Sequence, residues 1–314
     1  MNTQLLSDIR ENMKKVMIGN SHTIDLVLTA LAAGGHVLLE DVPGTGKTVL
    51  AKSLARSMDA AFGRIQFTPD LLPTDVVGLN RLDSKTGEFV FAEGPAFCNI
   101  LLADEINRAT PKTQSSLLEC MAEYQITVDG TTHPLAAPFF VIATENSLES
   151  LGTFPLPEAQ LDRFLMKLSM ESLNAADELS LVERFLREEP LDTITPVCSA
   201  ADIAQLQADC RTVYIHPDLM NYMIALIQAT RSDNKIINGV SPRGTLAFVR
   251  AAQGYALISG RDYVVPEDIK EMAVPVLAHR MTMNVSFDAT NASRQAIEHL
   301  LGSIPVPTEN WAGH

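Results

Sequence analysis

Residues 40–48 read EDVPGTGKT, a loop of small residues that runs into a lysine and a threonine. Gly44 and Gly46 let the backbone curl, so that successive N–H groups point inward and form an anion nest at the start of the next helix. In such a nest Lys47 would lie against the β- and γ-phosphates of a nucleotide, and Thr48 would give its hydroxyl to Mg²⁺. These residue types and their spacing predict a site for a nucleoside triphosphate with magnesium.

The loop departs at one position from the pattern G-x-x-x-x-G-K-[ST], because Asp41 stands where the first glycine is expected. Pro43 partly offsets the missing glycine by fixing φ at the bend. The alternative is a strand-to-helix turn that needs glycine and happens to hold a surface lysine. The apolar strand that leads directly into PGTGKT makes this alternative the weaker interpretation.

A pair of acids, Asp104 and Glu105, ends the apolar run NILLADE. The carboxyl ends of parallel strands form the edge at which ligands bind in open α/β folds. There Asp104 would hold Mg²⁺ through its water shell, and Glu105 would polarise a water molecule for in-line attack on the γ-phosphate. Taken alone, such a pair is typical of a solvated turn, but its position downstream of a Lys-Thr loop favours the catalytic interpretation.

Asn146 ends a third apolar run, PFFVIATEN. From a strand beside that of Asp104, its amide would orient the attacking water and contact the γ-phosphate. The alternative is a turn-forming asparagine, which is a common loop residue. Taken alone, the asparagine favours that alternative.

Five short apolar runs are typical of buried strands, and helical patterns lie between most of them. Strands that alternate with helices favour an α/β layered sheet. Two further segments, residues 80–95 and 125–135, are typical of β-hairpins, with turns near Lys85 and Gly130. The five expected strands begin at His36, Arg64, Asn99, Pro138 and Phe164.

The chain changes character after about residue 188, where a loop with two prolines precedes a series of helical patterns. Three of these helices begin with proline in the first turn. The sequence therefore predicts an α/β nucleotide-binding core with an N-terminal helix over residues 1–192 and a smaller all-helical domain over residues 193–314. The proline-marked starts lie at Pro217, Pro242 and Pro266.

The 314-residue chain is 46% apolar and carries a formal net charge of −14. Its apolar content suffices for a sizeable core, and its length suits one large and one small domain. The acidic balance argues against broad binding to a nucleic-acid backbone, which needs a basic surface. The four cysteines and seven histidines are scattered without metal or redox spacing, so we expect inert thiols in a reducing cytosol.

The N-terminal segment is typical of an amphipathic helix and lacks the apolar region and small-residue cleavage site of a signal peptide. No run of the sequence approaches the length needed to span a bilayer. We therefore expect a cytoplasmic protein without membrane insertion.

Five ordered motifs make the chain similar to a known family: GHVLLEDVPGTGKT, LLADEINRATPKTQSSLLECMAE, PFFVIATENS, LPEAQLDRF and SPRG. Together they resemble the MoxR branch of the AAA+ ATPases, over roughly residues 16–280. In that family an acidic or small residue also precedes the Val-Pro of the loop, which makes Asp41 less anomalous. The resemblance implies a P-loop AAA+ three-layer α/β core with a parallel sheet, followed by a smaller all-α lid domain, with the hairpins placed as in this clade.

The resemblance also implies roles for the motif residues. Residues 42–48 would form the Walker A loop, Asp104 and Glu105 the Walker B motif, and Asn146 sensor 1. Val16, Ile18 and Gly19 would lie near the adenine, and Thr48 and Asp104 would hold Mg²⁺. The residues expected to bind ATP are Ile18, Gly19, Val42, Pro43, Gly44, Thr45, Gly46, Lys47, Thr48, Val49 and Asp104.

Two arginines complete the catalytic set that the resemblance implies. Arg163, in LDRF, matches the arginine finger that reaches the neighbouring subunit's nucleotide, and Arg243, in SPRG, matches sensor 2, which extends from the lid to the γ-phosphate. The alternative for Arg163 is a surface ion pair with Asp162. Arg243 lies near a helix start, where a cation is unfavourable unless a phosphate lies opposite. Because an arginine in trans contributes about a thousandfold or more to turnover, an isolated subunit should hydrolyse slowly.

Glu145 marks a departure from the family, which commonly has Gln-Asn-Pro where this chain has Glu145-Asn146-Ser147. A carboxylate that pointed inward would disfavour ATP by Coulomb repulsion or need a cation partner. Because adjacent residues of a strand point to opposite faces, we expect Glu145 to point away from the phosphates.

The favoured interpretation is a ring-forming ATPase, expected from the family to be a hexamer, that remodels or matures partner proteins as hydrolysis rotates the lid against the core. By resemblance, a protein client or an adaptor with a von Willebrand A domain would be the partner. A nucleic-acid motor of the same clade is the alternative, but toward such binding the segment LDSKTGEF offers one lysine, Lys85, and the segment DGTTHPL offers only His133. The intact Glu105 argues against a third interpretation, a nucleotide-gated scaffold with little turnover.

Overall fold

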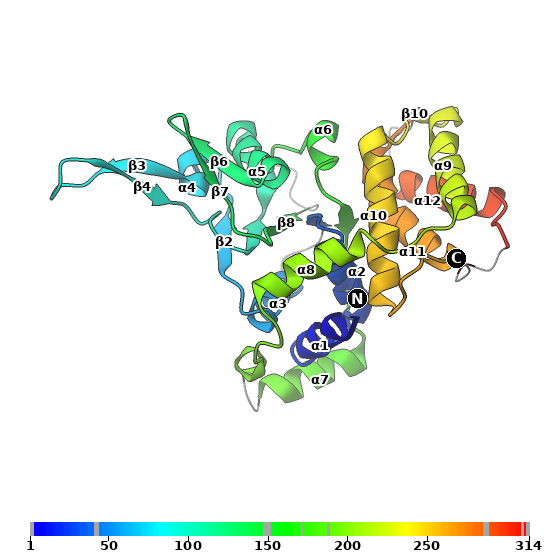
Figure 1. The fold of residues 1–314 in the computed structure, drawn as a ribbon, viewed down its shortest axis with the longest axis horizontal. Helices are drawn as coiled ribbons and strands as arrows, with labels where there is room; N and C mark the ends of the chain where they lie inside the picture. Colours follow the sequence, from blue (N-terminus) through cyan, green and yellow to red (C-terminus); the bar gives the residue numbers. More distant parts are fainter. Residues whose placement is uncertain are drawn as a thin grey trace.

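The computed structural model, shown in Figure 1, combines an α/β part with a helical part. Two hairpins project from the α/β part on the side away from the helical part. The structure describes residues 3–40, 44–146, 152–170, 172–186, 189–284, 289–308 and 311.

A five-stranded parallel sheet forms the centre of the α/β part. Its three inner strands are buried on both faces, which explains why the sequence there reads as continuous apolar runs. The expected parallel sheet is thereby confirmed. In spatial order the strands are β2 (Phe62–Gln66), β5 (Ile100–Asp104), β8 (Phe140–Glu145), β1 (Val37–Glu40) and β9 (Met166–Leu168).

Helices cover both faces of this sheet and give the predicted three layers. Leu38 and Leu39 of β1 illustrate the division, since neighbouring residues of a strand point to opposite faces and these two lie in different apolar clusters. The helices on the Leu39 face are α1 (Thr3–Lys14), α2 (Ser21–Ala32) and α3 (Lys47–Ser57), and those on the Leu38 face are α4 (Pro73–Val77) and α5 (Pro111–Glu123).

The carboxyl ends of the inner strands bring polar residues to one edge of the sheet. β5 ends at Asp104, and β8 ends at Glu145. β1 ends at Glu40, directly before the phosphate loop, and Glu40 pairs in register with Glu145. The motif residues that follow these strands therefore meet although they are distant in sequence.

Two antiparallel hairpins extend from the α/β part, as the turn signals predict. The first joins β3 (Gly78–Leu82) to β4 (Phe89–Glu93), and the second joins β6 (Gln125–Val128) to β7 (Thr131–Pro134). They contact one another, because the rings of Phe91 and His133 stack with centroids 4.0 Å apart, and Asn80 Nδ2 donates to Asp129 Oδ2 at 2.7 Å. Figure 1 shows that the β3–β4 hairpin reaches farthest from the sheet.

The helical part follows the predicted pattern of capped helices. Ser199 and Ser241 accept hydrogen bonds at the starts of two helices, and proline occupies the first turn of three. A short antiparallel ribbon, which the sequence analysis did not anticipate, adds two strands. The helices are α8 (Ala200–Cys210), α9 (Pro217–Ser232), α10 (Pro242–Ile258), α11 (Pro266–Leu277) and α12 (Ala289–Ser303), and the ribbon pairs β10 (Ile236–Asn238) with β11 (Thr282–Met283).

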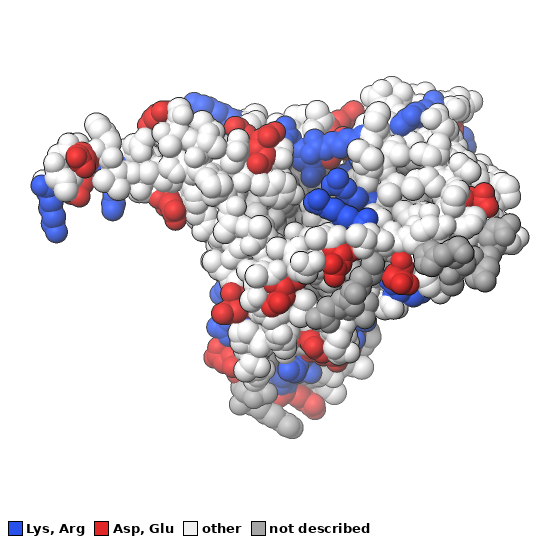
Figure 2. Space-filling view, viewed as in Figure 1, with Lys and Arg blue, Asp and Glu red and all other residues white. Residues whose placement is uncertain are grey.

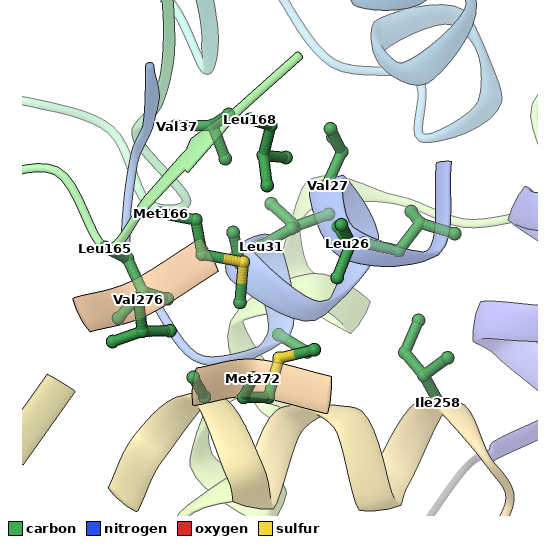
Figure 3. Close-up of a cluster of buried hydrophobic side chains, with 14 of the residues drawn as sticks. Leu26, Val27, Leu31, Val37, Leu165, Met166, Leu168, Ile258, Met272 and Val276 are labelled. Atoms are coloured by element: carbon green, nitrogen blue, oxygen red, sulfur yellow. The ribbon is translucent and has the colours of Figure 1, made fainter. Parts of the chain in front are cut away.

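One apolar cluster joins the sheet to the helical part. Figure 3 shows Leu31 of α2 and Met166 of β9 facing Met272 of α11. α10 also packs against α2, and Gly254 permits this approach because a Cβ there would lie 2.8 Å from the Thr29 carbonyl oxygen. Since the core is continuous, the division expected between residues 192 and 193 stays a prediction.

All four cysteines are free thiols, and three of them are buried. Burial raises the pKa of Cys98, Cys120 and Cys210 to about 12, and that of Cys198 to about 11. Thiolates of this kind are scarce at neutral pH, in keeping with the expectation of inert thiols. Within the described residues, the helices are too short or too polar to cross a bilayer.

Candidate nucleotide-binding site

The phosphate loop leads directly into the first turn of α3. Gly44 and Gly46 have φ values of 88° and 90°, which side-chain-bearing residues rarely adopt. A Cβ at Gly44 would meet no atom within 4 Å, so backbone conformation rather than space requires glycine there. Asp41, Val42 and Pro43 of the predicted loop lie outside the described residues.

A cavity of about 240 Å³ lies in front of this loop at the carboxyl edge of the sheet. It collects residues from the loop and from the ends of β2, β5 and β8. Most of the predicted phosphate and catalytic residues therefore share one space, together with Arg64 and Thr144, which the sequence analysis missed. The lining residues are Gly44, Thr45, Gly46, Lys47, Thr48, Arg64, Asp104, Glu105, Thr144 and Asn146.

Thr144 connects the two strand-end acids. Its hydroxyl donates to Asp104 Oδ1 at 2.8 Å and accepts from the backbone N–H of Glu105, also at 2.8 Å. The Asp104 carboxylate and the Glu105 backbone are thus oriented by one hydroxyl. The sequence does hold a signal for Thr144. It lies two residues before Asn146, so both side chains face the same side of the strand.

Glu105 has an unusual backbone for a residue with a side chain. Its φ of 56° lies in the left-handed region, which costs on the order of 1–2 kcal/mol for an L-residue. The Thr144 hydrogen bond and an ion pair from Arg108 Nε to Glu105 Oε2 at 3.2 Å hold this conformation. Strain of this kind is typical of functional sites, where it aims a side chain.

Glu145 faces away from the cavity while its neighbours Thr144 and Asn146 line it, in accordance with strand alternation. Its carboxylate lies 3.8 Å from Lys167 Nζ, which in turn lies 2.8 Å from Glu40 Oε2. Burial raises the pKa of Glu145, and Lys167 partly opposes this shift. The added charge is therefore partnered on the far side of the strand from the phosphate loop.

A second cavity of about 280 Å³ shares Gly44, Thr45 and Gly46 with the first and is mainly apolar. The predicted Val16, Ile18 and Val49 line it. Gly19 lies at its margin, where a Cβ would come 2.7 Å from Leu173 Cδ2. The remaining lining residues are Met17, Asn20, Ser172, Leu173, Glu178, Leu181 and Phe185.

The helix α7 (Ala175–Phe185) supplies one wall of this apolar cavity and was missed in the sequence analysis. Leu181 and Phe185 are four residues apart, so they project from one helix face. Phe185 nevertheless remains 43% exposed. A large exposed aromatic side chain beside a phosphate loop is suited to cover a flat apolar ring.

Arg163 and Arg243 lie away from both cavities. They line a separate basin of about 240 Å³ with Arg250 and Arg280, and Arg163 Nη1 donates to the Leu118 carbonyl oxygen at 2.9 Å. Figure 2 shows Lys and Arg side chains gathered in the hollow between the helical part and the part that carries α5 and α6 (Glu158–Leu161). Arg243 therefore does not line the phosphate cavity of its own chain, where the resemblance would place it.

The donor set of the first cavity fits a magnesium nucleotide. Lys47, the glycine-loop amides and Arg64 can face phosphate oxygens, whereas the Thr48 hydroxyl and the Asp104 carboxylate are the oxygen ligands that Mg²⁺ prefers. Within the described ranges, His, Cys, Asp and Glu side chains form no group of three or more that could hold a metal ion. A cation here would thus depend on phosphate oxygens as well, as Mg²⁺ commonly does.

Comparison with known proteins agrees with this geometry. The model of the ATPase family associated with various cellular activities (AAA) matches residues 36–166, and the model of the AAA lid domain matches residues 228–300. The fold and the cavity thus define an AAA-type ATPase core with its lid.

Individual relatives narrow this class. The chain is 46% identical over 309 residues to the uncharacterized protein YeaC of Bacillus subtilis, covering 98% of this chain and 97% of the relative. It is 37% identical over 308 residues to chaperone MoxR1 of Mycobacterium tuberculosis, covering 95% and 81%. A crystal structure of a Cytophaga hutchinsonii protein assigned as an ATPase matches with a TM-score of 0.89 and 38% identity, covering 98% and 96%. The chain belongs to the MoxR family of AAA+ ATPases.

Proposed function

We propose that this chain hydrolyses ATP at junctions between identical subunits and uses the reaction to remodel partner proteins. One observation carries the proposal: a phosphate loop, two strand-end acids and Asn146 surround one cavity, while Arg163 and Arg243 lie on another surface. Such a division is expected where two neighbouring copies contact each nucleotide.

The cavity residues have the chemistry that phosphoryl transfer to water requires. Lys47 and the amides at the start of α3 would hold the phosphates. Thr48 and Asp104 would hold Mg²⁺, which would supply positive charge against the phosphate oxygens. Glu105 would accept a proton from the attacking water, and Asn146 would orient that water.

The arginine basin would serve the adjacent subunit. Arg163, Arg243 and Arg250 concentrate positive charge on one surface, as stabilisation of a terminal phosphate during transfer requires. Arg243 would thus act from the lid on a neighbour's phosphate rather than on its own. A closed ring satisfies every such head-to-tail contact, and six copies are expected from the family resemblance.

The β3–β4 hairpin would contact the client. Leu82, Phe89 and Val90 on it are large apolar side chains exposed to solvent, and Arg81 and Lys85 are its cations. Exposed apolar groups suit a protein client better than a phosphate backbone. The chaperone naming of the Mycobacterium tuberculosis relative supports the same choice. An adaptor with a von Willebrand A domain remains a proposal that rests on the family resemblance.

The Glu105→Gln variant tests the proposed hydrolysis. It should bind ATP as the unaltered chain does but turn over at least about a hundredfold more slowly, because the general base is lost. Glu298→Gln, a change of the same type on the exposed surface of α12, should leave turnover unaltered. Unchanged turnover in Glu105→Gln would show that another group activates the water.

The Glu105→Gln variant, which should bind ATP but hydrolyse it very slowly, also tests whether the partner is a protein or a nucleic acid. With ATP it should form an assembly larger than the monomer and retain a protein partner in a pull-down. Tight binding of single-stranded DNA in a filter assay at moderate salt would instead favour a nucleic-acid motor. A chain that stays monomeric at high concentration and ignores ATP with magnesium would overturn the proposal.

A further inference from the structure

Arg64 reaches across the edge of the sheet to the acid expected to hold magnesium. Its Nη2 lies 2.8 Å from Asp104 Oδ2 and 3.2 Å from Gln66 Oε1. Strand pairing explains the contact, because β2 lies beside β5 and Gln66 pairs in register with Asp104. Arg64 and Gln66 are two residues apart and so face the same side of β2.

This ion pair competes with the predicted metal site. One oxygen of Asp104 already accepts the Thr144 hydroxyl, and the other accepts Arg64. A guanidinium at 2.8 Å from the carboxylate would repel a divalent cation brought to the same oxygen or to its water shell. Arg64 must therefore leave Asp104 before Mg²⁺ can be held there.

Arg64 is able to move. Its side chain is 47% exposed and lines the same cavity as Lys47 and Asn146. Glu105 also lines this cavity, but its carboxylate pairs with Arg108. A bound nucleotide would add its terminal phosphate, whose oxygens match the fork of a guanidinium. A short swing of one side chain would exchange a carboxylate partner for a phosphate partner.

We propose that Arg64 is a two-position residue, which pairs with Asp104 as the structure shows and moves to the terminal phosphate when a magnesium triphosphate binds. The inference rests on the proposed function, since it presumes nucleotide in this cavity. It adds an arginine from the same subunit to those expected from the neighbour. It also gives the site a means to distinguish a triphosphate from a diphosphate, because only the former offers Arg64 a new partner.

Calorimetric titration with AMP-PNP and with ADP, each with and without Mg²⁺, tests the two positions. In Arg64→Gln, magnesium AMP-PNP should bind about tenfold or more weakly, because a charge-assisted contact is lost. Magnesium ADP should bind this variant at least as tightly as it binds the unaltered chain. Mg²⁺ should also strengthen ADP binding more in this variant than in the unaltered chain, because the Asp104 carboxylate no longer has to give up an ion pair with Arg64 to hold the metal.

Two further variants complete the test. Arg64→Lys retains the charge without the fork, so its loss of AMP-PNP affinity should be intermediate, and it serves if the glutamine variant does not fold. Arg294→Gln, on the exposed surface of α12, should bind both nucleotides normally. If the unaltered chain binds both nucleotides and Arg64→Gln weakens them equally or not at all, the two-position inference is wrong while the proposed function stands. If the unaltered chain binds neither, both fail.

Discussion

Arg280 Nε donates to Asp162 Oδ1 at 2.7 Å, and this bond ties the helical part to the segment that carries Arg163. The second carboxylate oxygen of Asp162 accepts the Ser241 hydroxyl at 3.1 Å, and Ser241 caps the helix that carries Arg243. One carboxylate therefore holds both proposed phosphate-binding arginines in a fixed relation. In the proposed ring they would approach a neighbour's nucleotide as one unit.

We expect Asp162→Ala to be strongly destabilising, because Arg280 is only 2% exposed and would lose its countercharge. The free energy of unfolding, measured by urea denaturation, should fall by about 3 kcal/mol or more. Asp192→Ala removes a solvent-exposed ion pair with Arg56 and should cost about 1 kcal/mol or less. Equal losses in the two variants would show that the Asp162–Arg280 pair does not clamp the helical part.

The proposed action of the arginines on a neighbouring subunit predicts complementation. Arg163→Ala and Glu105→Gln should each bind ATP but turn over slowly, the arginine variant by about a thousandfold. Mixed in equal amounts, the two inactive variants should recover turnover, since about a quarter of the junctions in a random ring join an intact cavity to an intact basin. A mixture that stays as inactive as its components would mean that Arg163 acts within its own subunit.

Thr144 is expected to position Asp104 and Glu105 rather than to touch the reacting atoms. Thr144→Val keeps the side chain's shape and removes both hydrogen bonds, so kcat should fall about tenfold to a hundredfold, with little change in affinity for ADP. Thr144→Ser restores the hydroxyl and should recover most of the rate in steady-state assays. If serine fails to rescue, packing of the methyl group rather than the hydroxyl is responsible.

Phe185 should contribute to nucleotide affinity through the base. Phe185→Ala should weaken ATP and ADP equally, by about tenfold, because base stacking on an aromatic ring is lost. The adjacent Leu186 is 80% exposed and lines neither cavity, so Leu186→Ala is the matched control and should bind normally. If Phe185→Ala weakened the binding of ATP but not of ADP, Phe185 would act at the terminal phosphate rather than at the base.

His36 predicts a specific acid sensitivity. Burial lowers its pKa to about 4, and the Val141 N–H donates to its Nδ1 at 3.1 Å, so the neutral ring belongs to the folded state. Stability from this group is fully present above pH 6.5 and is lost as the pH falls toward 4, by about 3 kcal/mol. Denaturation between pH 4 and 7 should show a shallower slope for His36→Gln.

Features that depend only on residues close together in the chain could be predicted from the sequence. The glycine loop, the acids that end β5 and the helix starts at proline are local patterns, so their places could be predicted. The parallel sheet followed from apolar runs that alternate with helices. The resemblance to the MoxR branch, carried by five short motifs, was confirmed by the relatives.

Features that depend on distant contacts could not be predicted in this way. Arg64 and Asp104 are 40 positions apart, and Asp162 and Arg280 are 118 apart. No local pattern distinguishes these arginines from surface residues. The wall that α7 gives to the apolar cavity was missed for the same reason, since only the folded chain places its apolar residues beside the phosphate loop. The position of Arg243 away from its own cavity depends on how α10 packs against α2.

The arginine basin lies apart from the cavity that Glu105 lines, and this has a consequence for a single polypeptide. If the basin serves a neighbour's nucleotide as proposed, a subunit on its own would bind nucleotide but hydrolyse it only slowly. Fast hydrolysis would begin only when copies become abundant enough to assemble, so the concentration of the protein in the cell would itself control its ATPase rate.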